Sequence, residues 1–354
     1  MRLLITGGAG FVGARLARAL LARGRLQGRC IERIVLADQA AAPSWLLADA
    51  RVEGRVGTLL AQAQALHDEA FDAVFHLASA VSGECELDFE LGLRSNLDST
   101  RALLDALRAR VQQRGVTPAR LVFASSIAVF GPDPAYPFPA LVGDDTLPTP
   151  QTSYGTHKLV CEQLIADYTR KGFVDGRAAR LVTVTVRPGR PNGAASSFFS
   201  GIIREPLAGV TAPLPVDPTV AHPVASVQRM VEGLIAVAEA SREALVGRTA
   251  ITLPGLNVTV QQMLDALERV AGPAVRARVV PQPDAHIAGI VANWPRGVVT
   301  HRAAALGLRP EASFDDIIRS YIADCRDPVL GNPAALRGMS SGAVLGGTGG
   351  RATY

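Results

Sequence analysis

The sequence predicts an α/β fold built on a doubly wound parallel sheet, followed by a smaller and less regular region. Three observations support this prediction. A glycine-rich turn, residues 6–13, directly follows the apolar run of residues 3–5. Ser126 comes just after a second apolar run at residues 121–124, and a Tyr-x-x-x-Lys pair follows a proline-rich loop.

Composition limits the class of protein. The chain has 354 residues, 48% of them hydrophobic and 19% charged, which is enough for one large domain or two. The net charge of +4 is spread over many arginines without aromatic residues between them, so we expect no nucleic-acid partner. No apolar stretch reaches the length of a membrane span, so no membrane partner is expected. The first residues form a strand rather than a signal peptide, and we expect a cytoplasmic protein.

The cysteines and histidines do not suggest a metal site. Cys30, Cys85, Cys161 and Cys325 are widely spaced, as reduced thiols in a cytosolic protein are. No histidine pair has metal-ligand spacing, so we expect no metal. His76 ends a predicted strand, and we expect it to anchor the loop that follows.

Strands and helices alternate through the first half of the chain. This alternation predicts a parallel sheet covered on both faces, with ligands at the carboxyl ends of its strands. The predicted strands are residues 2–6, 34–38, 52–56, 73–75, 121–124 and 182–186, and the predicted helices include residues 10–22 and 96–108.

The glycine turn is typical of a dinucleotide site. Gly7, Gly10 and Gly13 stand three residues apart, between the first strand and the first helix. Glycines there allow a tight turn, a close approach of backbone to pyrophosphate, and close packing of helix on strand. The start of the helix offers free N–H groups to the phosphates. The sheet is therefore predicted to be of the Rossmann type.

Asp38 indicates which dinucleotide binds. It ends the second predicted strand, where a carboxylate can accept hydrogen bonds from the adenosine ribose hydroxyls. A 2′-phosphate would meet a like charge there, and neither Gln39 nor Ala40 is an arginine that could offset it. The sequence therefore favours NAD over NADP.

Tyr154 and Lys158 are predicted to be catalytic together with Ser126. A spacing of four places the tyrosine and the lysine on one helix face. A free tyrosine ionises near pH 10, and a neighbouring ammonium stabilises its anion. Tyr154 would take the proton of a hydroxyl group while hydride leaves the same carbon, and Ser126 would orient the substrate oxygen. The prediction is an NAD-dependent oxidoreductase.

The change in composition after Pro188 suggests three regions. Residues 1–188 would form the NAD-binding domain. Residues 189–326, with frequent prolines, would form a substrate-binding region that is interleaved with the main sheet. Residues 327–354, rich in Gly, Ser and Ala, are expected to be a flexible tail.

With these motifs, the chain resembles the extended short-chain dehydrogenase/reductase superfamily from residue 1 to about residue 324. The resemblance implies the catalytic roles given above and a homodimer. It also implies that a set of residues at strand ends and in the turn contacts the cofactor, namely Gly7, Gly10, Phe11, Val12, Gly13, Asp38, Leu77, Ala78, Ser79, Asn96, Tyr154, Lys158 and Pro188.

A narrower resemblance lies in residues 172–207, which are similar to D-erythronate dehydrogenases. It implies oxidation of the C2 hydroxyl of a small sugar acid, D-erythronate to 2-dehydro-D-erythronate. Val182 stands where that subgroup leads us to expect proline, and Val227 follows Ser226 where Ser-Pro is expected. These departures lie near the predicted substrate-binding region.

Residues after the last predicted strand fit an anionic sugar-acid substrate. A guanidinium binds a carboxylate through two parallel hydrogen bonds, and Arg204 is the favoured candidate over Arg187 and Arg190. Arg187 has the alternative of a structural role at its strand end, and Arg204 has the alternative of pairing with Glu205. The hydroxyls would be bound by Ser126, Asn192, Ser196 and Ser197, although the last two serines could equally cap a helix.

Three other functions fit parts of the pattern. A nucleotide-sugar epimerase or dehydratase would share the fold, although Val81 and Phe130 depart from the epimerase pattern. A uronate or other aldose-acid dehydrogenase would differ only in substrate. A redox-sensing protein that holds NAD without turnover usually lacks the tyrosine or the lysine, and this chain has both.

Overall fold

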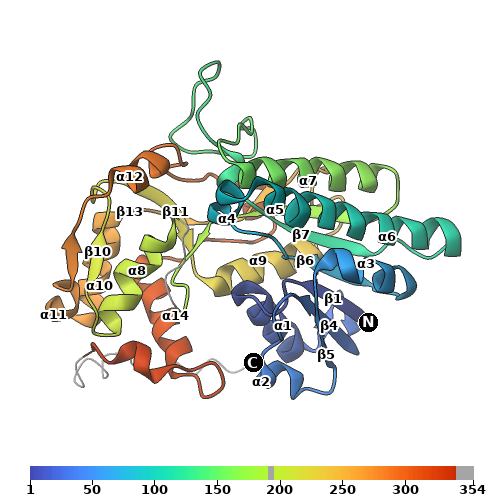
Figure 1. Cartoon of the computed structure of the whole chain (residues 1–354), viewed down its shortest axis with the longest axis horizontal. Coiled ribbons are helices and arrows are strands. Elements are labelled where there is room, and N and C mark those ends of the chain that lie inside the picture. Colours follow the sequence, from blue (N-terminus) through green and yellow to red (C-terminus); the bar gives the residue numbers. More distant parts are fainter. Residues whose placement is uncertain (190–194, 340–354) are drawn as a thin grey trace.

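The computed structural model describes residues 1–189 and 195–339, and it confirms the predicted Rossmann-type fold. Seven parallel strands form the central sheet in the order β12-β8-β7-β6-β1-β4-β5. The sheet lies in one lobe of the molecule and a second region lies beside it (Figure 1). Its strands are β1 (Arg2–Thr6), β4 (Arg33–Asp38), β5 (Val52–Val56), β6 (Ala73–His76), β7 (Arg120–Ser126), β8 (Asp175–Leu181) and β12 (Ile251–Thr252).

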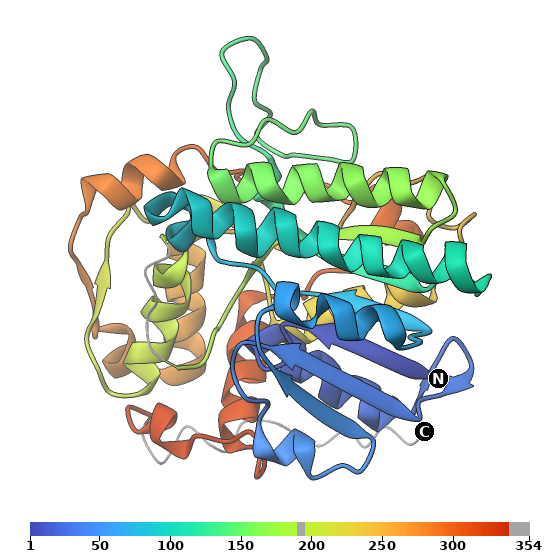
Figure 2. The same cartoon turned by 45° about the vertical axis from the view of Figure 1, so that its right-hand side comes forward.

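Both faces of the sheet are buried because successive apolar residues point to opposite sides. Leu3 and Ile5 belong to one core and Leu4 to the other. Figure 2 shows the helices stacked over the sheet. One face is covered by α1 (Phe11–Arg23), α2 (Ser44–Leu47) and α9 (Val227–Glu239), and the other by α3 (Leu59–Asp68), α6 (Ser99–Arg114) and α7 (Ser153–Arg170).

Short elements complete this lobe. A hairpin of two short strands follows α1, and a run of helical turns joins β6 to α6. They are β2 (Arg25–Leu26), β3 (Arg29–Cys30), α4 (Ser82–Leu87), α5 (Phe89–Gly92), the π-helix η1 (Leu93–Asp98) and, after β7, the 3-10 turn η2 (Ile127–Val129).

The prediction of the sixth strand was wrong. We expected it at residues 182–186, but β8 occupies that place in the sheet, and only β9 (Thr183–Val184) forms further on, paired with a strand of the second region. The β-branched run suggested a strand, whereas Asp175–Leu181 contains three charged residues that concealed a buried one.

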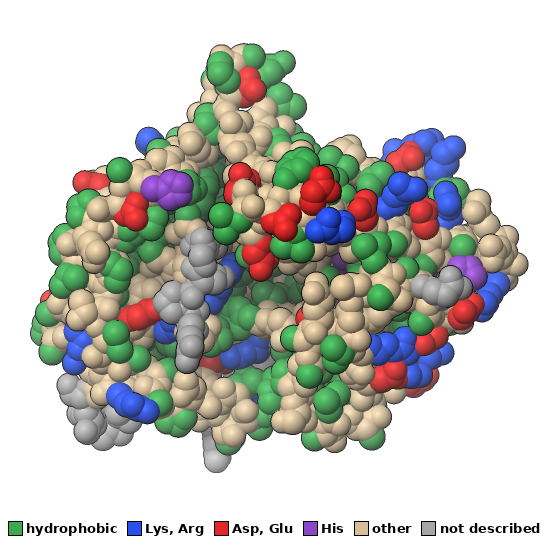
Figure 3. Space-filling model, in the orientation of Figure 1, with side chains coloured by type: hydrophobic (Ala, Val, Ile, Leu, Met, Phe, Trp, Pro, Cys, Tyr) green, Lys and Arg blue, Asp and Glu red, His purple; other side chains and the backbone are tan. Residues whose placement is uncertain are grey.

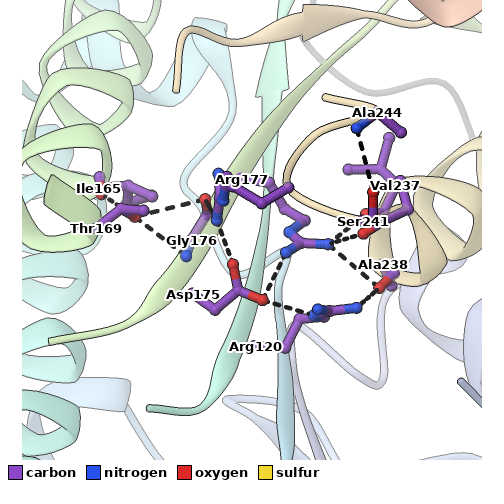
Figure 4. Close-up of polar contacts among 12 residues, drawn as sticks. Arg120, Ile165, Thr169, Asp175, Gly176, Arg177, Val237, Ala238, Ser241 and Ala244 are labelled. Carbon is purple, nitrogen blue, oxygen red and sulfur yellow. Dashed lines mark hydrogen bonds and ion pairs between the residues drawn. The ribbon is translucent and has the colours of Figure 1, made fainter. Parts of the chain in front are cut away.

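A cluster around Asp175 explains how these charges are buried. Asp175 and Arg120 begin adjacent strands at the amino edge of the sheet, and their side chains pair at 2.8 Å (Figure 4). Arg177 binds the same carboxylate at 2.6 Å and donates to main-chain carbonyls at the end of α9. Arg242 is a third partner of the Asp175 carboxylate. The charges of β8 are therefore paired within the structure rather than solvated.

The second region has its own core, and part of it returns to the main sheet. β12 pairs with β8, and α9 packs against β7 and α1. Two small sheets and several helices make up the rest: α8 (Ser197–Leu207), β10 (Ala212–Leu214), β11 (Ala221–Ala225), β13 (Leu256–Thr259), α10 (Val260–Ala271), α11 (Pro273–Arg276), β14 (Val279–Pro281), α12 (Ala285–Val291), α13 (His301–Ala305) and α14 (Phe314–Arg326).

Part of the segment expected to be a flexible tail is packed. Residues 333–336 form the short helix η3, and Ala335, Leu336 and Met339 lie against the second core. Residues 340–354 lie outside the described part of the chain. Among the helices that the structure describes, none has the length and apolar character needed to cross a membrane.

Candidate active site

The order of the strands predicts where a ligand binds. The chain leaves β1 toward β4 and β5 on one side, and later builds β6, β7 and β8 on the other. Such a switch point opens a crevice at the carboxyl ends of the strands. A pocket of about 580 Å³ lies there, lined by residues that follow β1, β4, β5 and β6 and by the helical turns after β6. The molecular surface is hollowed between the two lobes (Figure 3).

The glycine turn keeps this pocket open to a phosphate. Gly7 has φ +70°, and a Cβ there would lie 2.7 Å from the main-chain nitrogen of Ala78. A Cβ on Gly13 would collide with the carbonyl group of Gly7. A Cβ on Gly10 would meet only the Gly7 oxygen, at 3.2 Å, so glycine at this position leaves room for a group outside the protein. Gly10 caps α1 without a side-chain acceptor, which leaves first-turn N–H groups for an anion.

Asp38 lies in the same pocket with its carboxylate held in place. Its Oδ2 accepts a hydrogen bond from the main-chain N–H of Ala9 at 3.0 Å, and its Oδ1 accepts one from Ala40 at 3.1 Å. Each oxygen keeps a lone pair for a ribose hydroxyl. The glycine turn and this carboxylate together fit the adenosine and phosphate portions of NAD.

The loop after β6 forms the opposite wall. Leu77, Ala78 and Ser79, which the resemblance implies as cofactor contacts, line the pocket. Asn96 does not line it, but its Oδ1 accepts hydrogen bonds from the Ala80 N–H at 2.8 Å and the Ser79 hydroxyl at 3.1 Å. Asn96 lies on η1, and π-helical turns often mark functional sites.

The structure brings Ser126, Tyr154 and Lys158 to the carboxyl end of β7. Ser126 is the last residue of that strand, and its hydroxyl oxygen accepts a hydrogen bond from Ala128 N–H at 3.1 Å. The Lys158 side chain is buried, and its Nζ donates to the carbonyl oxygen of Ala124 at 2.8 Å. The same Nζ lies 5.4 Å from the centroid of the Tyr154 ring.

The start of α7 is fixed beside this strand end. Thr152 caps the helix by accepting a hydrogen bond from Gly155 N–H at 3.0 Å. A Cβ on Gly155 would collide with the carbonyl group of Ala128, so the helix approaches the η2 turn at backbone distance. Tyr154, the preceding residue, is thereby held at the end of α7 that packs against η2, the turn that follows Ser126.

A buried carboxylate that sequence reasoning missed supports this arrangement. Glu162 lies one helical turn beyond Lys158 and accepts a hydrogen bond from the Ser125 hydroxyl at 2.5 Å. Arg180 binds both of its oxygens, at 2.9 and 2.7 Å. The i+8 spacing from Tyr154 was a usable signal, since positions i, i+4 and i+8 share a helix face.

Arg187 is the second arginine considered as a partner of the substrate carboxylate. Burial lowers the pKa of its guanidinium, and an electrostatic interaction with Tyr154 raises it. The main-chain N–H of Arg187 donates to the Ser200 hydroxyl at 3.0 Å, and its Nε to the Val184 carbonyl at 3.3 Å. The main chain and side chain of Arg187 are thus held by α8 and β9.

Arg204 is placed differently. It donates to the main-chain carbonyl of Arg187 at 2.7 Å and pairs with Glu205 at 2.6 Å. It lines a second pocket, of about 610 Å³, between α1, α8 and α14, together with Phe11 and Pro188.

Two other residues predicted to bind substrate lie at the start of α8. Ser196 is the N-cap residue of this helix, without a side-chain capping bond, and Ser197 is its first residue. Asn192 and Arg190 lie outside the described residues. The roles predicted for these residues stay predictions.

Sequence reasoning also overlooked several residues that line the adenosine side. Thr58 and Gln62 follow β5, and Glu84 and Arg94 come from the turns after β6. Thr58 could have been found, because residue 57 is a glycine just past the carboxyl end of a strand. Within residues 1–189 and 195–339, no group of three His, Cys, Asp or Glu side chains could hold a metal ion.

Comparison with known proteins identifies the family. Residues 3–250 match the family described as "NAD dependent epimerase/dehydratase family". A D-erythronate dehydrogenase of Cupriavidus necator is 48% identical over 331 residues, 92% of this chain and 98% of that protein. A D-erythronate dehydrogenase of Haemophilus influenzae is 39% identical over 329 residues, which cover 91% of this chain and 99% of that protein.

Solved structures agree. The nucleoside-diphosphate-sugar epimerase from Agrobacterium tumefaciens superposes with a TM-score of 0.86 at 42% identity, covering 92% of this chain and 94% of that one. L-threonine 3-dehydrogenase from Trypanosoma brucei, at 21% identity and a TM-score of 0.77, shares the fold. The resemblance to extended short-chain dehydrogenases/reductases is confirmed, and the chain belongs to the NAD dependent epimerase/dehydratase family.

Proposed function

We propose that this protein oxidises a hydroxyl group of a small sugar acid with NAD, and that its substrate is D-erythronate. The observation that carries the reaction type is the buried Lys158 ammonium, held by the Ala124 carbonyl at 2.8 Å and lying 5.4 Å from the Tyr154 ring. Support for the substrate comes from two D-erythronate dehydrogenases that match this chain over nearly their full lengths.

In the proposed reaction, Tyr154 acts as the general base at C2 of the acid. Its phenolate oxygen takes the proton of the C2 hydroxyl, the C2–H bond breaks, and the carbon–oxygen double bond of 2-dehydro-D-erythronate forms. NAD, when bound, accepts the hydride. Lys158 places positive charge beside the phenolate, and Arg187 interacts with it electrostatically, so both stabilise it before the proton transfer.

Ser126 orients the oxygen that loses the proton. Its own hydroxyl oxygen already accepts a hydrogen bond from Ala128 N–H, so its proton is free to be donated to the substrate oxygen. We propose Asn192, Ser196 and Ser197 as partners of the remaining hydroxyls.

We place the substrate carboxylate at Arg187. The Arg187 guanidinium interacts electrostatically with Tyr154. Arg204, the candidate favoured by the sequence, has one end of its guanidinium on the Arg187 carbonyl and the other on Glu205. A carboxylate bound beside the base keeps C2, the adjacent carbon, within reach of the phenolate. Arg204 then acts by holding the Arg187 backbone.

The experiment that tests the proposal measures NADH formation with C4 to C6 sugar acids and with UDP-sugars. We expect turnover with D-erythronate and little with hexuronates. Tyr154→Phe should lower kcat by roughly a thousandfold, the upper part of the range for a general base. Tyr168→Phe is the matched control, because Tyr168 lies on the same helix but donates to Asp105 on α6. Activity of Tyr154→Phe near that of the control would reject Tyr154 as the base.

The carboxylate assignment has its own test. Arg187→Met should raise KM for the acid by about a hundredfold and leave NADH binding unchanged, since a charge-assisted bidentate contact is lost. Arg204→Met should have the smaller effect. If Arg204→Met raised the KM for the acid more than Arg187→Met, the carboxylate would be assigned to Arg204 instead.

A nucleotide-sugar epimerase is the second candidate, favoured by the 42% identity to the protein named as one from Agrobacterium tumefaciens. Interconversion of UDP-sugars without net NADH formation, and no turnover of sugar acids, would support it and remove the sugar-acid proposal.

A further inference from the structure

His76 is fully buried at the end of β6 and bridges two threonines. Its Nδ1 lies 2.6 Å from the Thr6 hydroxyl, at the end of β1, and its Nε2 lies 2.9 Å from the Thr100 hydroxyl, on α6. Both threonine side chains are buried as well. None of these three residues lines the 580 Å³ pocket, so the imidazole acts on the cofactor only through other residues.

The direction of each hydrogen bond follows from the number of protons available. The Thr100 hydroxyl lies 2.6 Å from the carbonyl oxygen of Asn96, which can only accept, so the single Thr100 proton is used there. Thr100 must then accept from His76 Nε2–H. The neutral imidazole has one N–H, so Nδ1 accepts the proton of Thr6. Thr6 Oγ1 in turn accepts from the Ala78 N–H at 3.2 Å.

This chain of bonds requires an uncharged imidazole. Burial, and secondarily the charge of Lys158, lowers the pKa of His76 to about 3. At neutral pH the ring therefore has one donor and one acceptor, as the two threonines demand. The bonds run in one direction, from Ala78 N–H through Thr6, His76 and Thr100 to the Asn96 carbonyl.

The two ends of this series of hydrogen bonds hold the same wall of the pocket. Thr6 holds the loop of residues 77–80 at Ala78, and the Asn96 side chain holds it at Ala80 N–H, 2.8 Å away. Through His76, these two supports are joined to each other. The closed ring of hydrogen bonds contains Thr6, which is the first residue of the glycine turn, the loop of residues 77–80, and the π-helix.

We propose that His76 is a positioning residue for NAD: it joins Thr6 to Thr100 and so sets the separation between the glycine turn and the loop of residues 77–80. The loop cannot move away from the turn unless one of these buried hydrogen bonds breaks. The inference depends on cofactor binding and not on the identity of the substrate.

The test measures the Kd of NADH and of ADP-ribose for the purified full chain by calorimetry. Thr100→Val keeps the shape of the side chain but breaks the ring of bonds, and it should weaken both ligands by about tenfold, the value of a buried hydrogen bond. Thr100→Ser keeps the hydroxyl and should stay within about twofold of the parent. His76→Phe should weaken both ligands at least as much as Thr100→Val.

The matched control is His222→Phe. His222 is the other fully buried histidine with two hydrogen bonds, to Thr183 and the Pro295 carbonyl, and it lies in the second core. It should lose stability while its Kd for NADH stays within about twofold of the parent.

Three outcomes would overturn the proposal. Thr100→Val could bind NADH within about twofold of the parent, or Thr100→Ser could lose as much affinity as Thr100→Val, which would remove the hydroxyl as the cause. A loss confined to NADH, with ADP-ribose unaffected, would place the effect at the nicotinamide end rather than at the loop.

Discussion

Lys158 Nζ donates a hydrogen bond to the main-chain carbonyl oxygen of Ala124 at 2.8 Å. This bond joins α7, which carries Tyr154, to β7, which ends at Ser126. Because the carbonyl lies two residues before the serine, the ammonium positions both proposed catalytic groups as well as supplying charge.

Lys158→Met should lower kcat by roughly a hundredfold or more and weaken NADH binding, because both the charge beside Tyr154 and the bond to β7 are lost. Lys171→Met is the control, since Lys171 is the exposed C-cap residue of the same helix. Steady-state kinetics and NADH titration of both variants check this. Equal kcat values for Lys158→Met and Lys171→Met would contradict the role given to Lys158.

Asp38→Ala should shift cofactor preference toward NADP. The carboxylate lines the adenosine pocket and would repel a 2′-phosphate, so its removal should lower the ratio of NADPH to NADH dissociation constants by about tenfold. Asp68→Ala, an exposed carboxylate on α3, should leave the ratio unchanged. The ratio is measured by fluorescence titration, and an unaltered value in Asp38→Ala would argue against the ribose contact.

Glu162→Gln should destabilise the fold and slow turnover. It leaves the Arg180 guanidinium buried without its carboxylate, which costs about 3–5 kcal/mol of unfolding free energy. The double variant Glu162→Gln/Arg180→Met removes both charges and should recover part of that loss. Asp167→Asn, which breaks an exposed pair with Arg170, should cost about 0.5 kcal/mol or less. Urea denaturation provides the comparison, and a double variant less stable than the single one would contradict it.

Stability should decrease as pH falls below 6.5. Burial lowers the pKa of His76 to about 3 and that of His222 to about 4, from 6.5. Between these values the unfolded chain binds protons that the folded one cannot, so each histidine removes about 1.4 kcal/mol per pH unit as pH falls.

Urea denaturation between pH 6.5 and 5 measures this slope. His222→Gln should lower the number of protons taken up on unfolding by about one, and the dependence of the unfolding free energy on pH should become weaker accordingly. His286→Gln, at an exposed position, should not change it. Identical slopes for all three proteins would show that His222 is not buried in its neutral form.

Features that depend on short spacings along the chain could be predicted. The glycine turn needs only residues 6–13 between a strand and a helix, and the Tyr154–Lys158 pair needs only helical geometry. The structure accordingly places Gly7, Gly10 and Asp38 in one pocket. The sixth strand was predicted at the wrong residues because hydropathy treats the arginines of β8 as exposed, and their partners on α7 and α9 lie far away in sequence.

By itself, the sequence determined the fold class, the cofactor turn and the helix face of the tyrosine and lysine, because each follows from backbone periodicity within a few residues. Only the tertiary structure decided that Glu162 lies beneath Ser125, 37 residues earlier, and that His76 links Thr6 to Thr100. It also decided that Arg204 pairs with Glu205 and binds the Arg187 carbonyl. The physical reason is that a buried polar group needs a hydrogen-bond partner. Which residue becomes that partner depends on how elements that are distant in sequence pack together.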